Sequence, residues 1–119
     1  MGTVYFTRKK LVDTNPKLVQ AFLDSLVDGW KRALDQPSEA IQKTGEQFKQ
    51  MDTNKELKSF LKGKEYFTGE KGRLLYSSPE RWREMANSLI ALKVIKSFDF
   101  QHNVNYQFLE NALNRDRSK

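Results

Sequence analysis

Hydrophobic residues recur three and four positions apart over residues 16–34, and this spacing predicts a long amphipathic helix. Asn15 is a favourable N-cap, and Pro16 suits the first helical position because its missing N–H would have no partner there. The apolar positions are Leu18, Val19, Phe22, Leu23, Leu26, Val27, Trp30 and Leu34. A stripe this wide predicts a helix that is covered on more than one side. Gly29 inside it costs about 1 kcal/mol relative to alanine, which indicates either close approach of another backbone or a tolerated glycine.

Shorter helical segments follow the first. Apolar spacing predicts them over residues 38–49, from Thr53 to about Leu61, from Ser77 to about Lys96, and over 105–114. Two of them begin with a hydroxyl three residues before a glutamate, at Thr53 and Ser77, which is the capping-box pattern. Residues 8–13 are predicted to form a helical turn or a loop, and residues 98–100 a loop.

Two short extended pieces are predicted in addition to the helices. Residues 3–7 are β-branched and aromatic, which favours a short strand whose sheet partners lie elsewhere. Residues 63–76 form a charged, glycine-rich loop with a brief extended piece at Tyr66 and Phe67. The predicted fold class is therefore mainly α with one or two short strands, in a single domain or partial domain over residues 1–119. Residues 115–119 are expected to fray.

Composition excludes several classes of site. The chain has 119 residues and 13.9 kDa, with 38% hydrophobic residues, which is enough for one modest core. It contains no Cys, so disulfides, thiolate zinc sites and cysteine nucleophiles are excluded, and its single histidine, His102, cannot form a metal-binding cluster. We therefore expect no metal and no cofactor. No apolar run is long enough to span a bilayer, and no signal-peptide pattern is present at the start.

The chain is basic, but its basic residues are not segregated. The net charge is +6 and the pI is about 9.6. The densest basic patch contains Lys55, Lys58, Lys62, Lys64, Lys71 and Arg73, and it is interleaved with Glu56, Glu65 and Glu70. Such mixing is typical of a solvated surface, so a nucleic-acid partner is not expected. A basic helical interaction or nucleic-acid-binding protein remains the alternative function.

Motifs of the common enzyme classes are absent, and we expect no catalytic activity. Residues 52–56 resemble the start of a calcium loop, but Leu57 stands where the turn needs glycine and Gly63 where a carboxylate is needed. The glycines of residues 63–72 do not form a phosphate loop, and no nucleophile elbow is present. His102 has Asp99 nearby in sequence but no candidate nucleophile in the same region.

The candidate ligand-binding residues are Tyr5 and Arg8. They flank the exit of the predicted N-terminal strand, and strand ends are where α/β folds place ligands. Trp30 and Trp82 lie on helix stripes, which indicates burial. Stacking on a flat ligand is their alternative role.

Several segments, taken in order, resemble one protein family. They are residues 15–23, Gly29–Trp30, Ala33–Leu34, Pro37, 39–41, 80–82, Met85–Ala86, Leu89, Val94–Ile95 and Phe108–Leu109. In this order they are similar to the C-terminal part of the substrate-binding proteins of ABC importers for nitrate, sulfonates, taurine and thiamine-pyrimidine precursors. The resemblance covers roughly residues 3–113. Its most specific part is the run from Gly29 to Ile41.

The resemblance implies a two-lobed α/β fold of the type II periplasmic binding class, of which this chain is the C-terminal portion of a lobe. It implies a non-catalytic solute-binding module for a small organic ligand, with an ABC permease or a fused signalling domain as partner. Some relatives synthesise the pyrimidine instead, but the lack of Cys and the single His argue against an enzyme here. The implied location is periplasmic or extracellular within a longer exported chain, or cytoplasmic if Met1 is the native start.

The resemblance also implies that strands and most ligand contacts of that fold lie outside this sequence. One strand and a few helices cannot form a parallel sheet that is buried on both faces. The wide apolar stripe of the first long helix would then lack part of its cover. We therefore expect this chain to pack as a small helical bundle, to self-associate as a homodimer, or to need a further segment.

Overall fold

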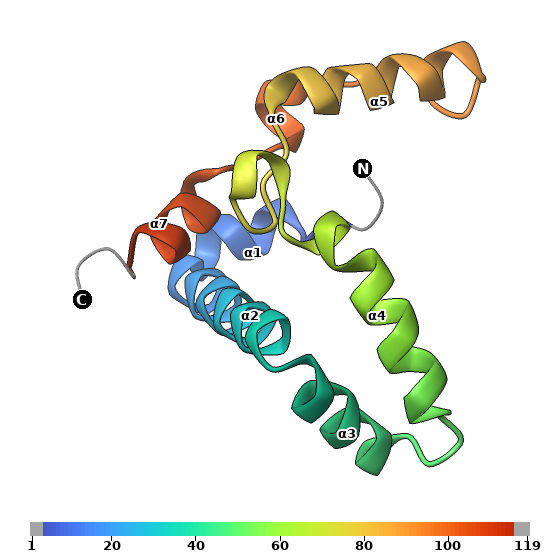
Figure 1. Cartoon of the computed structure of the whole chain (residues 1–119). Coiled ribbons are helices and arrows are strands. Elements are labelled where there is room, and N and C mark those ends of the chain that lie inside the picture. Colours follow the sequence, from blue (N-terminus) through green and yellow to red (C-terminus); the bar gives the residue numbers. More distant parts are fainter. Residues whose placement is uncertain (1–3, 116–119) are drawn as a thin grey trace.

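The computed structural model describes residues 4–115, which are mainly helical (Figure 1). The elements are α1 (Lys9–Thr14), α2 (Pro16–Asp35), α3 (Pro37–Gln47), α4 (Thr53–Phe67), the 3-10 helix η1 (Glu70–Gly72), α5 (Pro79–Ala91), α6 (Phe100–Asn103) and α7 (Gln107–Arg115). The mainly α prediction is confirmed. Its finer part, a lobe of a type II binding protein, stays a prediction.

Local capping explains where the main helices begin. The Asn15 side chain accepts a hydrogen bond from the Leu18 amide at 3.2 Å, and Pro16 is the first residue of α2, as predicted. Prolines also open α3 and α5. Asp52 and Ser78, rather than Thr53 and Ser77, are the N-caps of α4 and α5. The side chain of each accepts a hydrogen bond from the backbone amide three residues later in the chain.

The packing of α2 against α7 forms the centre of the structure. Val27 and Ala112 are fully buried there, together with Leu74 from the segment after η1. The partly buried residues around them are Leu23, Trp30, Leu34, Leu75, Leu109 and Leu113. One continuous core is therefore present, and it is small.

Polar contacts fix how α7 lies on α2. The Gln20 amide nitrogen donates to the Phe108 carbonyl oxygen at 2.9 Å, and its amide oxygen accepts from Asn111 at 3.1 Å. Arg115, at the end of α7, forms ion pairs with Asp24 and Asp28 of α2. These bonds set the register of the two helices, because each side chain reaches its partner at one relative position only.

The segment 69–78 links α4 to α5 and is held by two polar anchors. The Glu70 carboxylate accepts the Ser78 amide at 2.7 Å, and this hydrogen bond lowers the pKa of Glu70 from its ordinary value. Tyr106 donates from its hydroxyl to the Ser77 carbonyl at 2.5 Å. Burial raises the pKa of Tyr106 to about 12. Both anchors attach the start of α5 to its neighbours.

Beyond this start, α5 projects away from the other long helices (Figure 1). Its own aromatic contacts are local: Trp82 stacks on Phe98 with ring centroids 6.5 Å apart, and the Arg83 guanidinium lies 5.0 Å from the Phe100 ring centroid. Near its far end Leu92 and Val94 are 73% and 65% exposed. The core around Val27 therefore contributes little to the stability of α5.

The molecule is open for its size. Its accessible surface is 9474 Å², whereas a compact monomer of this mass exposes about 6,700 Å². The radius of gyration is 16.6 Å, against about 13.5 Å for a compact chain of this length. Much apolar surface therefore stays in contact with water.

The predicted strands are wrong within the described residues. Residues 4–8 have no regular secondary structure, and Thr3 lies outside the described residues. A β-strand requires a partner for its N–H and C=O groups, and residues 4–115 contain no strand to pair with it. Tyr66 and Phe67 are the last residues of α4 rather than an extended piece. Phe67 lies two turns after Phe60 and stacks on it, which favours the helical conformation.

Some boundaries also differ from the prediction. The loop predicted over residues 63–76 begins at Thr68, because α4 continues through Gly63 to Phe67. Residues 8–13 contain α1, and Phe100 begins the short helix α6, whose N-cap is Asp99. Arg115 ends α7, and the rest of the tail expected to fray, residues 116–119, lies outside the described residues.

Removal of two methyl groups from the core should destabilise the fold measurably. We expect Val27→Ala to lower the free energy of unfolding by about 2 kcal/mol, because Val27 is fully buried and the neighbours can only partly fill the cavity. Val94→Ala is the matched control, with an expected change below about 0.5 kcal/mol at a position 65% exposed. Urea unfolding measures both, and equal losses would contradict this location of the core.

Candidate functional site

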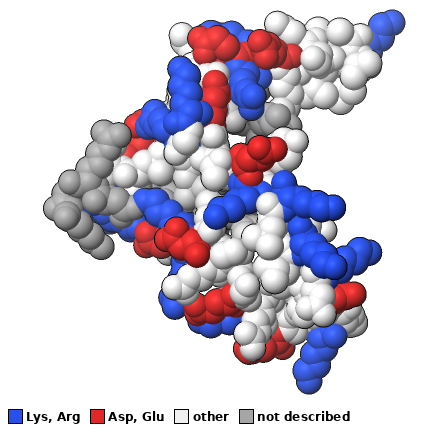
Figure 2. All heavy atoms as spheres, viewed as in Figure 1, with Lys and Arg blue, Asp and Glu red and all other residues white. Residues whose placement is uncertain are grey.

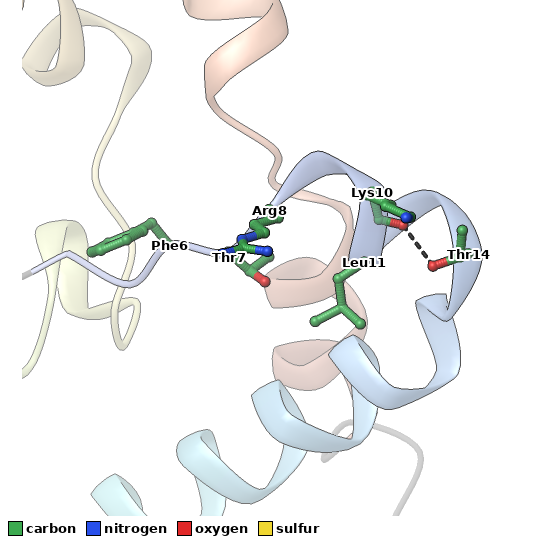
Figure 3. A pocket seen from close by; sticks show the side chains of 6 residues that line it. All are labelled: Phe6, Thr7, Arg8, Lys10, Leu11 and Thr14. Carbon is green, nitrogen blue, oxygen red and sulfur yellow. Dashed lines mark hydrogen bonds between the residues drawn. The ribbon is translucent and has the colours of Figure 1, made fainter.

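A surface hollow lies on the N-terminal side of α2, around α1. It has a volume of about 540 Å³ and is open to solvent. Its lining residues are Phe6, Thr7, Arg8, Lys10, Leu11 and Thr14 (Figure 3). Residues 6–8 come from the irregular segment and the others from α1. The Thr14 hydroxyl donates to the Lys10 carbonyl oxygen at 2.6 Å, which closes the end of α1.

The hollow is cationic. Within the described residues, no carboxylate forms an ion pair with Arg8 or Lys10, whereas the neighbouring Lys9 pairs with Asp13 at 3.3 Å on the same short helix. Two positive charges and two threonine hydroxyls therefore surround an opening that is otherwise lined by Phe6 and Leu11. Such a lining can attract a small anion and donate hydrogen bonds to it.

The two predicted ligand residues are not brought into one site. Arg8 lines the hollow, but Tyr5 does not. Tyr5 lies instead beside α2, where its hydroxyl oxygen accepts a hydrogen bond from the Trp30 indole nitrogen at 3.1 Å. The contact gives Tyr5 a structural partner, because it ties the N-terminal segment to the long helix.

Trp30 also belongs to an aromatic cluster with Phe60 and Phe67. Its ring centroid is 5.0 Å from that of Phe67 and 6.5 Å from that of Phe60, and the two phenylalanine centroids are 5.4 Å apart. These stacked rings join α2 to α4, which lie on two sides of a gap between ribbons in Figure 1. The cluster supports the prediction that Trp30 packs on a helix stripe, and Trp82 likewise stacks on Phe98.

Sequence reasoning missed the other polar residues of the hollow. Lys10 and Thr14 are four residues apart, which places them on one side of α1, whereas Thr7 belongs to the irregular segment before the helix. Residues 8–13 were predicted as a turn of helix or a loop, and the helical alternative would have indicated that Lys10 and Thr14 share a side.

A second, smaller hollow lies between α2 and α3. Its volume is about 220 Å³, and its lining residues are Gly29, Arg32, Ala33, Gln36, Glu39, Ala40 and Lys43. Glu39 lies between Lys43 and Arg32, at 2.9 and 3.5 Å. The hydrogen bond from Lys43 lowers the pKa of Glu39. The rim of this hollow is thus charged, while its base beside Gly29 and Ala33 has no large side chain.

Other candidate chemistry has a structural explanation. The His102 ring contacts Asp99, whose side chain also caps α6, and the hydrogen bond from His102 lowers the pKa of Asp99. Both residues are exposed. In the part of the chain that the structure describes, no group of three metal-binding side chains occurs, and no helix is long and apolar enough to cross a membrane.

Basic and acidic side chains are intermixed over the surface. On the face shown in Figure 2, Lys and Arg alternate with Asp and Glu. Arg73 pairs with Glu110 at 2.7 Å, and Arg81 lies 3.9 Å from Glu70. The visible face carries no continuous basic surface of the kind that follows a nucleic-acid backbone.

Tyr5→Phe separates the structural role of Tyr5 from a ligand-binding role. The change removes the oxygen that accepts the Trp30 N–H while keeping the ring, so we expect a loss of about 0.5 to 1 kcal/mol in the free energy of unfolding. Tyr66→Phe is the matched control, because Tyr66 is 81% exposed and should change stability by less than about 0.5 kcal/mol. Chemical denaturation followed by Trp fluorescence reports both, and an unchanged Tyr5→Phe protein would contradict the contact.

Comparison with known proteins gives one match. A family model described as NMT1/THI5 like matches residues 1–40, about a third of the chain. This segment contains both the hollow around α1 and the whole of α2. No curated protein and no solved structure matches the chain. At a coarse level the match supports a likeness to a substrate-binding family with small-molecule ligands.

Proposed function

We propose that this chain is a non-catalytic solute-binding module, or the C-terminal part of one, that serves an ABC importer or a receptor. The observation that carries the proposal is the NMT1/THI5-like match over residues 1–40. The matched segment coincides with the cationic hollow and the longest helix, so sequence likeness and a candidate binding surface fall on the same residues.

The ligand is a small organic or inorganic molecule such as a sulfonate, nitrate or a thiamine-pyrimidine precursor. Arg8 and Lys10 support an anionic ligand, because no carboxylate within residues 4–115 neutralises them. The Thr7 hydroxyl supplies a further hydrogen-bond donor, and Phe6 and Leu11 supply apolar contact.

The mechanism is closure of two lobes around the ligand, with this chain contributing scaffold to one lobe. The α2–α7 packing gives that scaffold a rigid base, since its core and its polar contacts fix both helices. The open hollow supports the same mechanism. Its surface covers a ligand from one side, so a second wall is required to enclose the ligand. A permease or a fused signalling domain would detect the closed state. The corresponding location is periplasmic or extracellular.

Calorimetric titration tests the proposed ligand class. Taurine, nitrate and hydroxymethylpyrimidine are titrated into the whole chain, and we expect at least one to bind with a Kd below about 1 mM. Arg8→Ala should weaken that binding at least tenfold, because it removes a cation that faces the hollow.

Lys62→Ala is the matched control for Arg8→Ala. It removes one positive charge from the exposed surface of α4, outside the hollow, and should leave the Kd unchanged. Absence of binding by all three compounds at 10 mM, or equal binding by Arg8→Ala and the unaltered chain, would contradict a ligand site at Arg8.

A further inference from the structure

The apolar stripe of α2 is covered on one side and exposed on the other. Val27, at the centre of the covered side, is fully buried. Leu18, Phe22 and Gly29 lie within about 40° of one another around the helix and about 140 to 180° from Val27. Leu18 is 53% exposed and Phe22 55%. We call the surface formed by Leu18, Phe22 and Gly29 the outer face of α2.

Gly29 leaves a recess on this outer face. A Cβ atom added at Gly29 would meet no atom within 4 Å. The hollow of about 220 Å³ between α2 and α3 begins here and also includes Ala33, one turn further along. The hollow is open to solvent, and Arg32, Glu39 and Lys43 line it as well. A ring that enters beside Gly29 would therefore meet the small residues Gly29 and Ala33 on α2 and the charged side chains at the rim.

The large and small residues of the outer face are arranged so that two copies complement each other. In an antiparallel pair of α2 helices related by a two-fold axis between Ser25 and Leu26, each Phe22 lies opposite the other copy's Gly29. Each Leu18 then lies opposite the other copy's Ala33. A two-fold interface requires such self-complementarity, because the same surface serves both partners. This arrangement gives Gly29 a role, because a glycine lets the second copy approach α2 closely. Among residues 4–115 of the single chain, no other segment comes close to Gly29.

The chain as a whole also exposes more surface than a compact monomer does. The chain exposes 9474 Å², about two-fifths more than a compact monomer of its mass. A standard protein–protein interface buries about 800 Å² from each partner. Burial of that amount would still leave the protein more exposed than a compact monomer, so a dimer removes only part of the excess.

We propose that the outer face of α2 is a homodimer interface, in which Phe22 of each copy enters the recess at Gly29 of the other. The occupant of the face is thus a second copy of this chain. The inference rests on the geometry of α2 and α3 and is independent of the ligand-binding proposal.

Sedimentation velocity over 1 to 200 μM tests the unaltered chain. We expect the weight-average mass to rise from 13.9 kDa toward twice that value, with a Kd in the micromolar range. A chain that stays monomeric at 200 μM would overturn the proposal and leave the face to another partner.

Two substitutions test the geometry. Phe22→Arg places a charge in the recess, and we expect the dimer Kd to rise at least tenfold. Gly29→Leu fills the recess with an apolar side chain, and it too should raise the Kd at least tenfold. In the single chain the added leucine begins in open space, and leucine has the better helix propensity, so helicity by circular dichroism should be kept or increased.

Leu92→Arg is the control, because Leu92 is 73% exposed and lies outside the outer face of α2. It should leave the Kd unchanged. Gly29→Leu also separates the proposed fit from non-specific hydrophobic association, which extra apolar surface would strengthen. A dimer that tightens with Gly29→Leu, or one that Leu92→Arg weakens as much as Phe22→Arg does, would overturn the proposal.

Discussion

The packing of α2 against α7 is the interaction on which the rest of the structure depends. It buries Val27 and Ala112 completely, and Leu74 closes the same core from the segment after η1. Gln20 and Arg115 hold the two helices in register. The aromatic cluster on Trp30 and the anchors at the start of α5 then attach α4 and α5 to this pair. A small core with polar anchors thus holds α2, α4, α5 and α7 together.

The constraint that makes the molecule open is the distribution of apolar residues around α2. The helix is apolar on two sides. One of these sides is covered by α7 and by Leu74 and Leu75. The covered side holds the fold together, and the uncovered side is available for association. The ligand proposal concerns the N-terminal approach to α2, and the dimer proposal concerns its outer face. The two proposals therefore involve separate surfaces of the same segment.

The sequence was sufficient to predict which segments are helical and where most of the helices begin, because capping and 3.6-residue periodicity are local properties. Asn15 and Pro16 begin α2 as predicted. The strand over residues 3–7 was mispredicted because β-propensity takes effect only through pairing, which depends on residues distant in sequence. Tyr5 illustrates the same limit for the site, since its partner Trp30 lies 25 residues away. Arg8 was identified by its charge and position, but the hollow around it depends on the fold of α1.

Native-state hydrogen exchange followed by NMR tests most directly whether the α2–α7 pair supports the structure. The amides around Val27 in α2 and around Ala112 in α7 should exchange most slowly and with similar rates, because they open only when the core does. The amides in the middle of α5 should exchange at least about tenfold faster, since α5 projects from the core. Protection of α5 equal to that of α2, or rapid exchange at Val27, would contradict this account.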